Sequence, residues 1–200
     1  MIITKLVPAK KKLTLVYIDG EYAMKLDTQI LFEECVKVGS VVDDDRLHDL
    51  IEKSEYKRAK EKALWLLSQR DYSRKKLTEK LKAEASEDVC EKVCERMEEV
   101  GLLNDESYAK RLSHDLIHIK RLSTRGALYK LLEKGIDREL AEEVLSEFDT
   151  DPVEQLVEII ERKYSDKLAD EKLRRRTVAA LQRLGYSWSD IKAAIEKFEE

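Results

Sequence analysis

The sequence predicts a mainly α-helical protein: an elongated array of three tandem three-helix repeats, preceded by a small N-terminal β-hairpin or sheet with short helices. Three observations predict this fold class. The 200 residues include only six glycines and two prolines, so long stretches can continue as helix. Apolar residues recur at helical spacing, and side-chain class repeats at offsets of 51 and 50 residues. A fixed period of this size is typical of repeat proteins, whose units bury apolar faces against one another.

The repeat is clearest in the last helix of each unit. Ser86, Asp137 and Ser187 each precede such a helix. The same offsets align three apolar sets and one basic set: Cys94, Leu145 and Ile195; Met97, Phe148 and Phe198; Leu77, Leu128 and Val178; Arg74, Arg125 and Arg175. A cation early in a helix is disfavoured by roughly 0.3 to 1 kcal/mol. The basic position therefore indicates a role other than stability.

The first 55 residues form a predicted N-terminal extension. Between residues 11 and 26, two β-prone runs flank Asp19-Gly20, a pair typical of hairpin turns because both central residues need positive φ. Further expected elements are a third strand at 2–7, a short helix at 28–37, and a helical stretch capped by Asp43 or Asp44 that reaches Gln69. The sequence leaves open whether that stretch is one helix or two.

The three repeats are expected at 56–103, 104–150 and 151–200. Polar capping residues precede the predicted helices, and Gly101, Gly135 and Gly185 follow helix ends. Pro152 suits the first turn of a helix, where its missing N–H costs little. The expected helices after Gln69 are 73–83, 86–100, 104–120, 124–134, 137–148, 152–164, 169–184 and 187–198.

Composition predicts a cytoplasmic protein without a membrane segment. No run approaches the roughly 18 to 20 apolar residues of a membrane span. The first twelve residues lack the apolar core of a signal peptide. Three cysteines are too few and too unevenly spaced for a disulfide framework, so reduced thiols are expected.

Neither catalysis nor a cofactor is expected. The chain has no glycine-rich nucleotide loop and no nucleophile elbow. Cys90 and Cys94, with His114 and His118, superficially resemble a zinc ligand set. The repeat places both cysteines at apolar core positions, where cysteine behaves as a small hydrophobe, so no metal site is predicted.

Charge alternates along the chain in phase with the repeats. Residues 56–82 carry ten basic side chains against three acidic ones, whereas residues 83–107 carry two against nine. The basic clusters are candidate contacts to phosphates or to a partner's carboxylates: Arg70, Arg74, Lys75, Lys76 and Lys80; Arg121, Arg125 and Lys130; Arg174, Arg175 and Arg176. Tyr72, Tyr129 and Tyr186 lie close to them in sequence, as packing residues or as platforms for bases. If the repeats stack, their basic side chains would form one continuous stripe.

Several motifs resemble the bacterial RecX regulatory proteins. They are Ala63-Leu64-Trp65-Leu66-Leu67-Ser68-Gln69-Arg70, then Ser73-Arg74-x-x-Leu77-x-x-Lys80-Leu81, then Gly101-Leu102-Leu103-Asn104-Asp105-x-x-Tyr108-Ala109. Lys134-Gly135-Ile136-Asp137 and Arg183-Leu184-Gly185-Tyr186-Ser187 extend the match, which covers about Tyr56 to the C-terminus. Two departures concern local loops: Ala85 stands where many members have glycine, and Arg121-Leu122-Ser123 replaces a connection that commonly contains glycine.

The resemblance implies a non-enzymatic protein of DNA repair, homologous recombination and the SOS response. Such a protein binds the RecA filament on single-stranded DNA and lowers ATPase activity, filament growth and strand exchange. A monomer with at most weak affinity for DNA alone is expected. Two alternatives stay open: an autonomous nucleic-acid-binding protein, and a helical adaptor for an unrelated protein.

Overall fold

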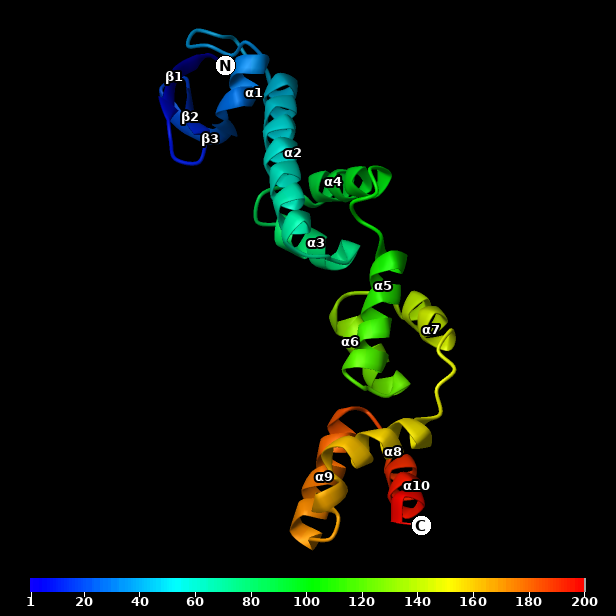
Figure 1. Cartoon of the computed structure of the whole chain (residues 1–200). Helices are drawn as coiled ribbons and strands as arrows, with labels where there is room; N and C mark the ends of the chain where they lie inside the picture. The colour runs from blue at the N-terminus through cyan, green and yellow to red at the C-terminus, as the bar shows by residue number, and fades with distance from the viewer. Residues whose placement is uncertain (200) are drawn as a thin grey trace. The chain divides into compact units, whose positions relative to one another are not determined.

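The computed structural model describes residues 1–199 (Figure 1). The chain divides into two compact units, an N-terminal unit from Met1 to Leu103 and a C-terminal unit that begins at Asn104. Helices dominate both units, as the sequence predicts. No helix in the described part of the chain is both long and apolar enough to cross a membrane.

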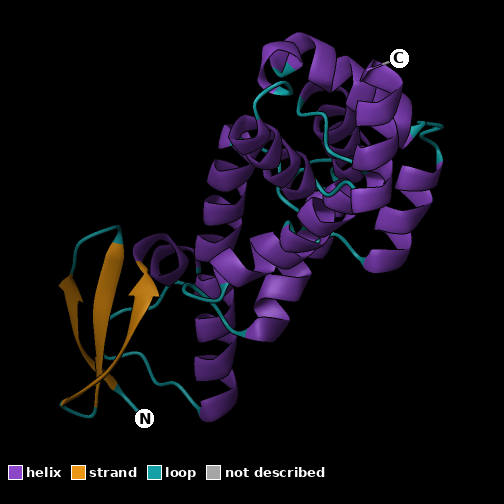
Figure 2. Ribbon diagram, turned by 90° about the horizontal axis from the view of Figure 1, so that it is seen from below, coloured by secondary structure: helices purple, strands orange, loops and turns teal. Residues whose placement is uncertain are grey.

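A three-stranded antiparallel sheet begins the N-terminal unit (Figure 2). Its strands are β1 (Ile3–Pro8), β2 (Leu13–Ile18) and β3 (Glu21–Asp27), in that order. Asp19 and Gly20 both have positive φ, 50° and 93°. The predicted hairpin, its turn and the third strand are therefore confirmed.

Helix α1 (Thr28–Glu33) is shorter than the predicted helix at 28–37. Cys35 has a φ of 53°, a left-handed conformation that a helix cannot continue through. The chain turns back here because Gly39 and Ser40 form backbone hydrogen bonds with Ile3 of β1. This contact with β1 thus ends α1 earlier than the local sequence predicts.

Helix α2 (Asp44–Gln69) is a single helix of 26 residues, capped by Asp43. Its first half packs against the sheet through Leu50, and its second half contributes Ala59 and Ala63 to the core of the first repeat. The helix is continuous across positions 55 and 56, where the predicted boundary between extension and repeat lies. That boundary stays a prediction.

A buried ion pair joins the sheet to α2. The Asp27 side chain is 3% exposed, and its carboxylate lies 2.8 Å from Lys57 Nζ. The same carboxylate caps α1, and the Asp27 backbone N–H donates to Ser54 Oγ at 2.8 Å. Removing one partner of such a pair leaves an uncompensated charge, so this contact fixes the sheet on the helix.

Each repeat has its own hydrophobic core. The helices that complete the repeats are α3 (Arg74–Leu81), α4 (Glu87–Glu99), α5 (Asp105–His114), α6 (Thr124–Glu133), α7 (Arg138–Ser146), α8 (Pro152–Lys163), α9 (Glu171–Arg183) and α10 (Trp188–Glu199). Helix α5 continues as a π-helical turn over Asp115–Ile119, and a 3-10 turn over Ser165–Lys167 follows α8. Cys90 and Cys94 are fully buried in the first core, which confirms them as core residues.

The middle helices align differently from the sequence prediction. Their buried positions are Leu77 and Leu81 in α3, Ala127 and Leu131 in α6, and Thr177 and Leu181 in α9, so both offsets are 50. The third helices keep offsets of 51 and 50, as Cys90, Ala141 and Ile191 show. Arg125 and Arg175 therefore correspond to Lys75 rather than to Arg74. The first repeat is one residue shorter between its middle and last helices.

Candidate binding surface

The predicted basic residues of the N-terminal unit lie on α3 and at the end of α2. Arg74 is engaged by α4: its guanidinium lies 2.5 Å from the Glu98 carboxylate and 4.0 Å from that of Glu95. The hydrogen bond to Glu98 raises the pKa of Arg74. Glu98 thus engages this cation within the unit, which leaves it less available to a partner.

The other basic residues of this unit are more accessible. Arg70 is exposed, and its guanidinium lies 4.8 Å from the centre of the Tyr72 ring. Lys76 pairs with Glu79 on the same helix at 2.7 Å. Lys75 and Lys80 are exposed on α3. Exposed pairs within one helix are worth only about 0.3 to 0.5 kcal/mol, so these cations remain available to a partner.

In the C-terminal unit, a close backbone contact holds the second and third repeats together. A Cβ atom at Gly126 would lie 2.3 Å from the Leu184 carbonyl oxygen, and one at Gly185 would lie 2.6 Å from the Gly126 Cα. The Ser123 backbone N–H donates to the same Leu184 carbonyl at 3.0 Å. Because side chains are absent on both sides, α6 and the segment after α9 approach backbone to backbone.

Tyr186 strengthens this contact from the third repeat. Its ring is buried, and its hydroxyl lies 3.2 Å from the Arg121 carbonyl oxygen and 3.0 Å from Gln155 Oε1. Burial raises the pKa of the hydroxyl to about 12, although the nearby Arg121 guanidinium opposes that shift. Tyr186 is therefore a packing residue and not a platform for bases. Arg121 itself pairs with Glu158 at 3.2 Å.

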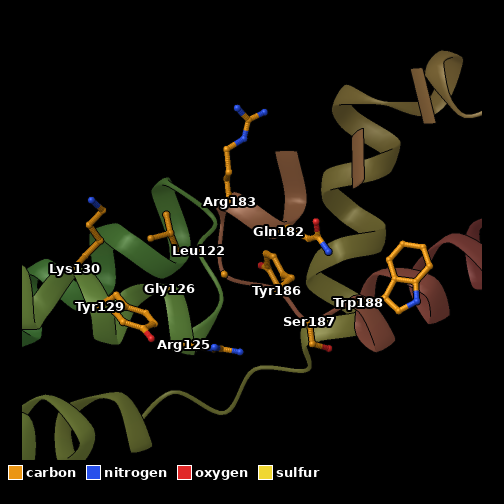
Figure 3. A pocket seen from close by; sticks show the side chains of 11 residues that line it. Leu122, Arg125, Gly126, Tyr129, Lys130, Gln182, Arg183, Tyr186, Ser187 and Trp188 are labelled. Atoms are coloured by element: carbon orange, nitrogen blue, oxygen red, sulfur yellow. The ribbon is translucent and has the colours of Figure 1, made fainter. Parts of the chain in front are cut away.

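A hollow of about 580 Å³ lies beside this contact, and we call it the inter-repeat hollow. Its lining residues come from α6 and the segment just before it, from the end of α9, and from the turn that leads into the start of α10: Leu122, Arg125, Gly126, Tyr129, Lys130, Gln182, Arg183, Gly185, Tyr186, Ser187 and Trp188. Figure 3 shows Arg125 extending from α6 toward Ser187, with the Tyr129 and Trp188 rings on either side of Tyr186. None of the described side chains that line it is acidic.

A second hollow of about 430 Å³ shares Trp188 with the first. It contains the predicted residues Arg174 and Arg175, together with Glu171 and Glu196. Arg175 pairs with Glu171 at 2.5 Å, and Arg174 with Glu199 at 2.9 Å. This second hollow is therefore mixed in charge. Arg176 is exposed on α9 and lines neither hollow.

The basic clusters of the sequence predict part of this surface. They include Arg125 and Lys130, which both line the inter-repeat hollow, but not Arg183 or Trp188. Arg183 precedes the Leu-Gly-Tyr-Ser motif, and Trp188 follows it directly. A tryptophan next to the glycine-containing turn between the last two helices of the third repeat was the available signal.

Among residues 1–199, no group of three or more histidine, cysteine or acidic side chains is arranged to hold a metal ion. His114 and His118 contact each other, with ring centres 4.7 Å apart, and His118 also contacts Phe148.

Comparison with known proteins identifies the family. Three RecX family models match successive segments: the first three-helix domain at residues 59–97, the second at 104–145 and the third at 149–195. Regulatory protein RecX of Clostridium acetobutylicum is 32% identical over 203 residues, which cover 94% of this chain and 92% of that protein. This chain belongs to the RecX family. Regulatory protein RecX of Bacillus subtilis is 31% identical and is covered over 71% of its length.

Solved RecX structures share the fold. The crystal structure of a regulatory protein RecX aligns over 98% of both chains, with a TM-score of 0.60 and 20% identity. RecX from Lactobacillus salivarius aligns over 72% of this chain and 97% of its own, with a TM-score of 0.62 and 23% identity. The family is regulatory, and its three-helix domains correspond to the repeats that the sequence predicts.

Proposed function

We propose that this RecX protein binds the RecA filament on single-stranded DNA and inhibits RecA ATPase activity, filament growth and strand exchange. Family membership supports the regulatory role, and the basic surfaces on α3, α6 and α9 support an anionic, polymeric partner. The observation that carries the proposal is the inter-repeat hollow, where Arg125, Lys130 and Arg183 meet without an acidic neighbour in the described lining.

A filament suits a repeat protein because it offers the same groups many times. Separate weak contacts on linked units raise overall affinity when the geometry allows them to engage together. The proposed contacts include the remaining sequence-selected cations, of which Arg70, Lys75, Lys80, Arg175 and Arg176 are exposed. Arg74 contributes less, because Glu98 engages its guanidinium.

The test is DNA-dependent ATP hydrolysis by RecA with increasing amounts of the full chain. The unmodified protein should inhibit hydrolysis, and Arg125→Glu/Arg183→Glu should require at least tenfold more protein for the same inhibition. Co-sedimentation with the filament should weaken in parallel. An unmodified protein that neither inhibits hydrolysis nor sediments with the filament would contradict the proposal.

A charge-matched control is available in the same unit. Lys110 and Arg138 are exposed, pair with acids on α5 and α7, and line neither hollow. Lys110→Glu/Arg138→Glu changes the net charge by the same amount and should inhibit within threefold of the unmodified protein. Equal losses in the two double variants would indicate a general effect of net charge.

A further inference from the structure

The inter-repeat hollow has the electrostatics of a polyanion site. Its described lining includes three basic side chains and no acidic one. Lys130 pairs with Glu133 at 2.7 Å, but both side chains are more than half exposed, so that pair competes weakly with a phosphate. The Arg183 Nε–H donates to the Ala179 carbonyl at 3.2 Å, which leaves its terminal nitrogens for a partner.

Two helix N-termini add to this positive field. Arg125 and Gly126 belong to the first turn of α6, while Ser187 and Trp188 form the start of α10. Each helix has at least ten residues, and a helix N-terminus carries a partial positive charge of roughly half an elementary charge. At α10 the Asp190 carboxylate, which accepts a hydrogen bond from Ser187 Oγ at 2.6 Å, offsets part of this charge, so α6 contributes more of the field. The hollow therefore favours anions through both side chains and backbone.

Exposed aromatic rings distinguish this hollow from a simple basic patch. Tyr129 is 65% exposed and Trp188 is 57% exposed. Neither ring belongs to a described hydrophobic core, whereas the Tyr186 ring between them is buried in the core of the third repeat. Exposed rings beside cations are the arrangement on which unpaired bases stack, at about 1 to 3 kcal/mol for each base.

We propose that the inter-repeat hollow is a binding site for single-stranded nucleic acid. Phosphates contact Arg125, Lys130 and Arg183, and bases stack on Trp188 and Tyr129. Single strands are favoured over a duplex, because paired bases do not offer their faces to side chains. The inference rests on the proposed function in that the RecA filament supplies the strand, but it assigns the DNA contact to this chain's own residues.

The first experiment measures affinity without RecA. The probe is a fluorescently labelled thymidine oligonucleotide, and anisotropy is recorded with the full chain at several salt concentrations. Three phosphate contacts predict a slope of about −2 in log affinity against log salt. Arg125→Glu/Arg183→Glu should bind at least tenfold more weakly, and Lys110→Glu/Arg138→Glu should stay within threefold. Arg125→Gln/Arg183→Gln removes the positive charges without adding negative ones that repel phosphate. Its affinity for the oligonucleotide tests the inference if the glutamate variant folds poorly.

The second experiment uses the two tryptophans of the chain. In Trp65→Phe the remaining Trp188 should be quenched by the oligonucleotide, because a stacked base contacts the indole. In Trp188→Phe the remaining Trp65, which lies on α2, should change little. Trp188→Ala should also weaken binding about fivefold or more, since stacking is worth at least about 1 kcal/mol.

The outcomes separate this inference from the proposed function. Unchanged oligonucleotide binding by both arginine variants would overturn the inference, as would equal affinity for a duplex of the same length. No oligonucleotide binding, combined with loss of RecA inhibition in Arg125→Glu/Arg183→Glu, would mean that the hollow receives an acidic protein segment; the inference then fails while the proposed function stands. Oligonucleotide binding without any inhibition of RecA would reject the proposed function alone.

Discussion

The first repeat differs from the second and third repeats in how far acidic side chains engage its basic side chains. On α3, the Arg74 guanidinium is held by Glu98, and Lys76 is paired with Glu79. In the inter-repeat hollow, Arg125, Lys130 and Arg183 line one cavity to which no described acidic side chain contributes. Both regions are basic in sequence, and Lys130 pairs with Glu133 at 2.7 Å just as Lys76 pairs with Glu79. The difference is that Glu98 engages the Arg74 guanidinium, whereas no acidic side chain belongs to the described lining of the hollow. The number of basic residues in a segment therefore does not measure the charge that a partner meets.

The repeats also differ in the turn that follows the middle helix. Gly135 and Gly185 follow α6 and α9 with φ of 84° and 94°. The first repeat turns through 82–86 without a glycine, and no residue of that segment has positive φ. Only Gly185 also makes the backbone contact with Gly126 that builds the hollow. Four tests, each built on one or two substitutions, distinguish the two regions, and they follow in order of decreasing effect on stability.

Gly185→Ala should have the largest effect because it breaks the contact between repeats. A Cβ atom there meets the Gly126 backbone at 2.6 Å and also forces an L side chain into a left-handed conformation. Overpacking and left-handed strain together should cost about 3 kcal/mol in the free energy of unfolding. Urea denaturation measures this loss. Gly101→Ala is the control, since Gly101 has φ +72° with open space around it, and it should cost only about 1 to 2 kcal/mol.

Tyr186→Phe should cost about 1 to 2 kcal/mol, because it leaves the Arg121 carbonyl and Gln155 without the hydroxyl. The raised pKa of Tyr186, about 12 against an ordinary 10, also predicts a pH dependence. The neutral hydroxyl is favoured in the folded state. Its contribution is therefore complete below about pH 10 and is lost as pH rises toward 12.

Absorbance of tyrosinate during alkaline titration measures this effect. A phase near pH 12 should be present in the unmodified protein and absent from Tyr186→Phe. Retention of that phase in the variant would contradict the assignment to Tyr186.

Gly135→Ala should cost about 1 to 2 kcal/mol, since alanine must adopt a φ of 84°. Ala85→Gly, at the matching turn of the first repeat, should cost only about 0.5 to 1 kcal/mol through the flexibility of the unfolded chain. Thermal unfolding of the two variants compares the turns. A stabilising effect of Ala85→Gly would show that the first repeat also needs a left-handed residue there.

Arg74→Ala should lower the free energy of unfolding by at most about 1 kcal/mol, and Arg125→Ala by less, because surface ion pairs contribute little. A double-mutant cycle with Glu98→Ala isolates the Arg74 pair and should give a coupling below about 1 kcal/mol. The expected order in oligonucleotide binding is the reverse, with Arg125→Ala the more damaging variant. Equal binding by the two variants would remove the distinction between the regions.

Much of the fold follows from local sequence. Asp19-Gly20 favours a hairpin because aspartate and glycine adopt positive φ more readily than most residues do. Ser73, Asp43 and Asn104 fix helix starts because their side chains accept orphan backbone N–H groups. The alignment of the middle helices could not be predicted from local sequence. Leu77 and Leu128 are both apolar and are aligned for that reason, but only Leu77 is buried. A shift of one residue preserves hydrophobic pattern in such segments, and packing alone selects the register.

The three-helix repeats, their caps and the alternation of charge could be predicted from the sequence, since these depend on neighbours within a few residues or on a fixed period. Long-range contacts were needed to show that α1 ends at Glu33, that Glu98 holds Arg74, and that Gly126 meets Gly185. Each of these depends on groups from distant segments reaching contact distance. Arg183 and Trp188 join Arg125 for the same reason: close backbone approach of two repeats, and not proximity in sequence, forms the hollow.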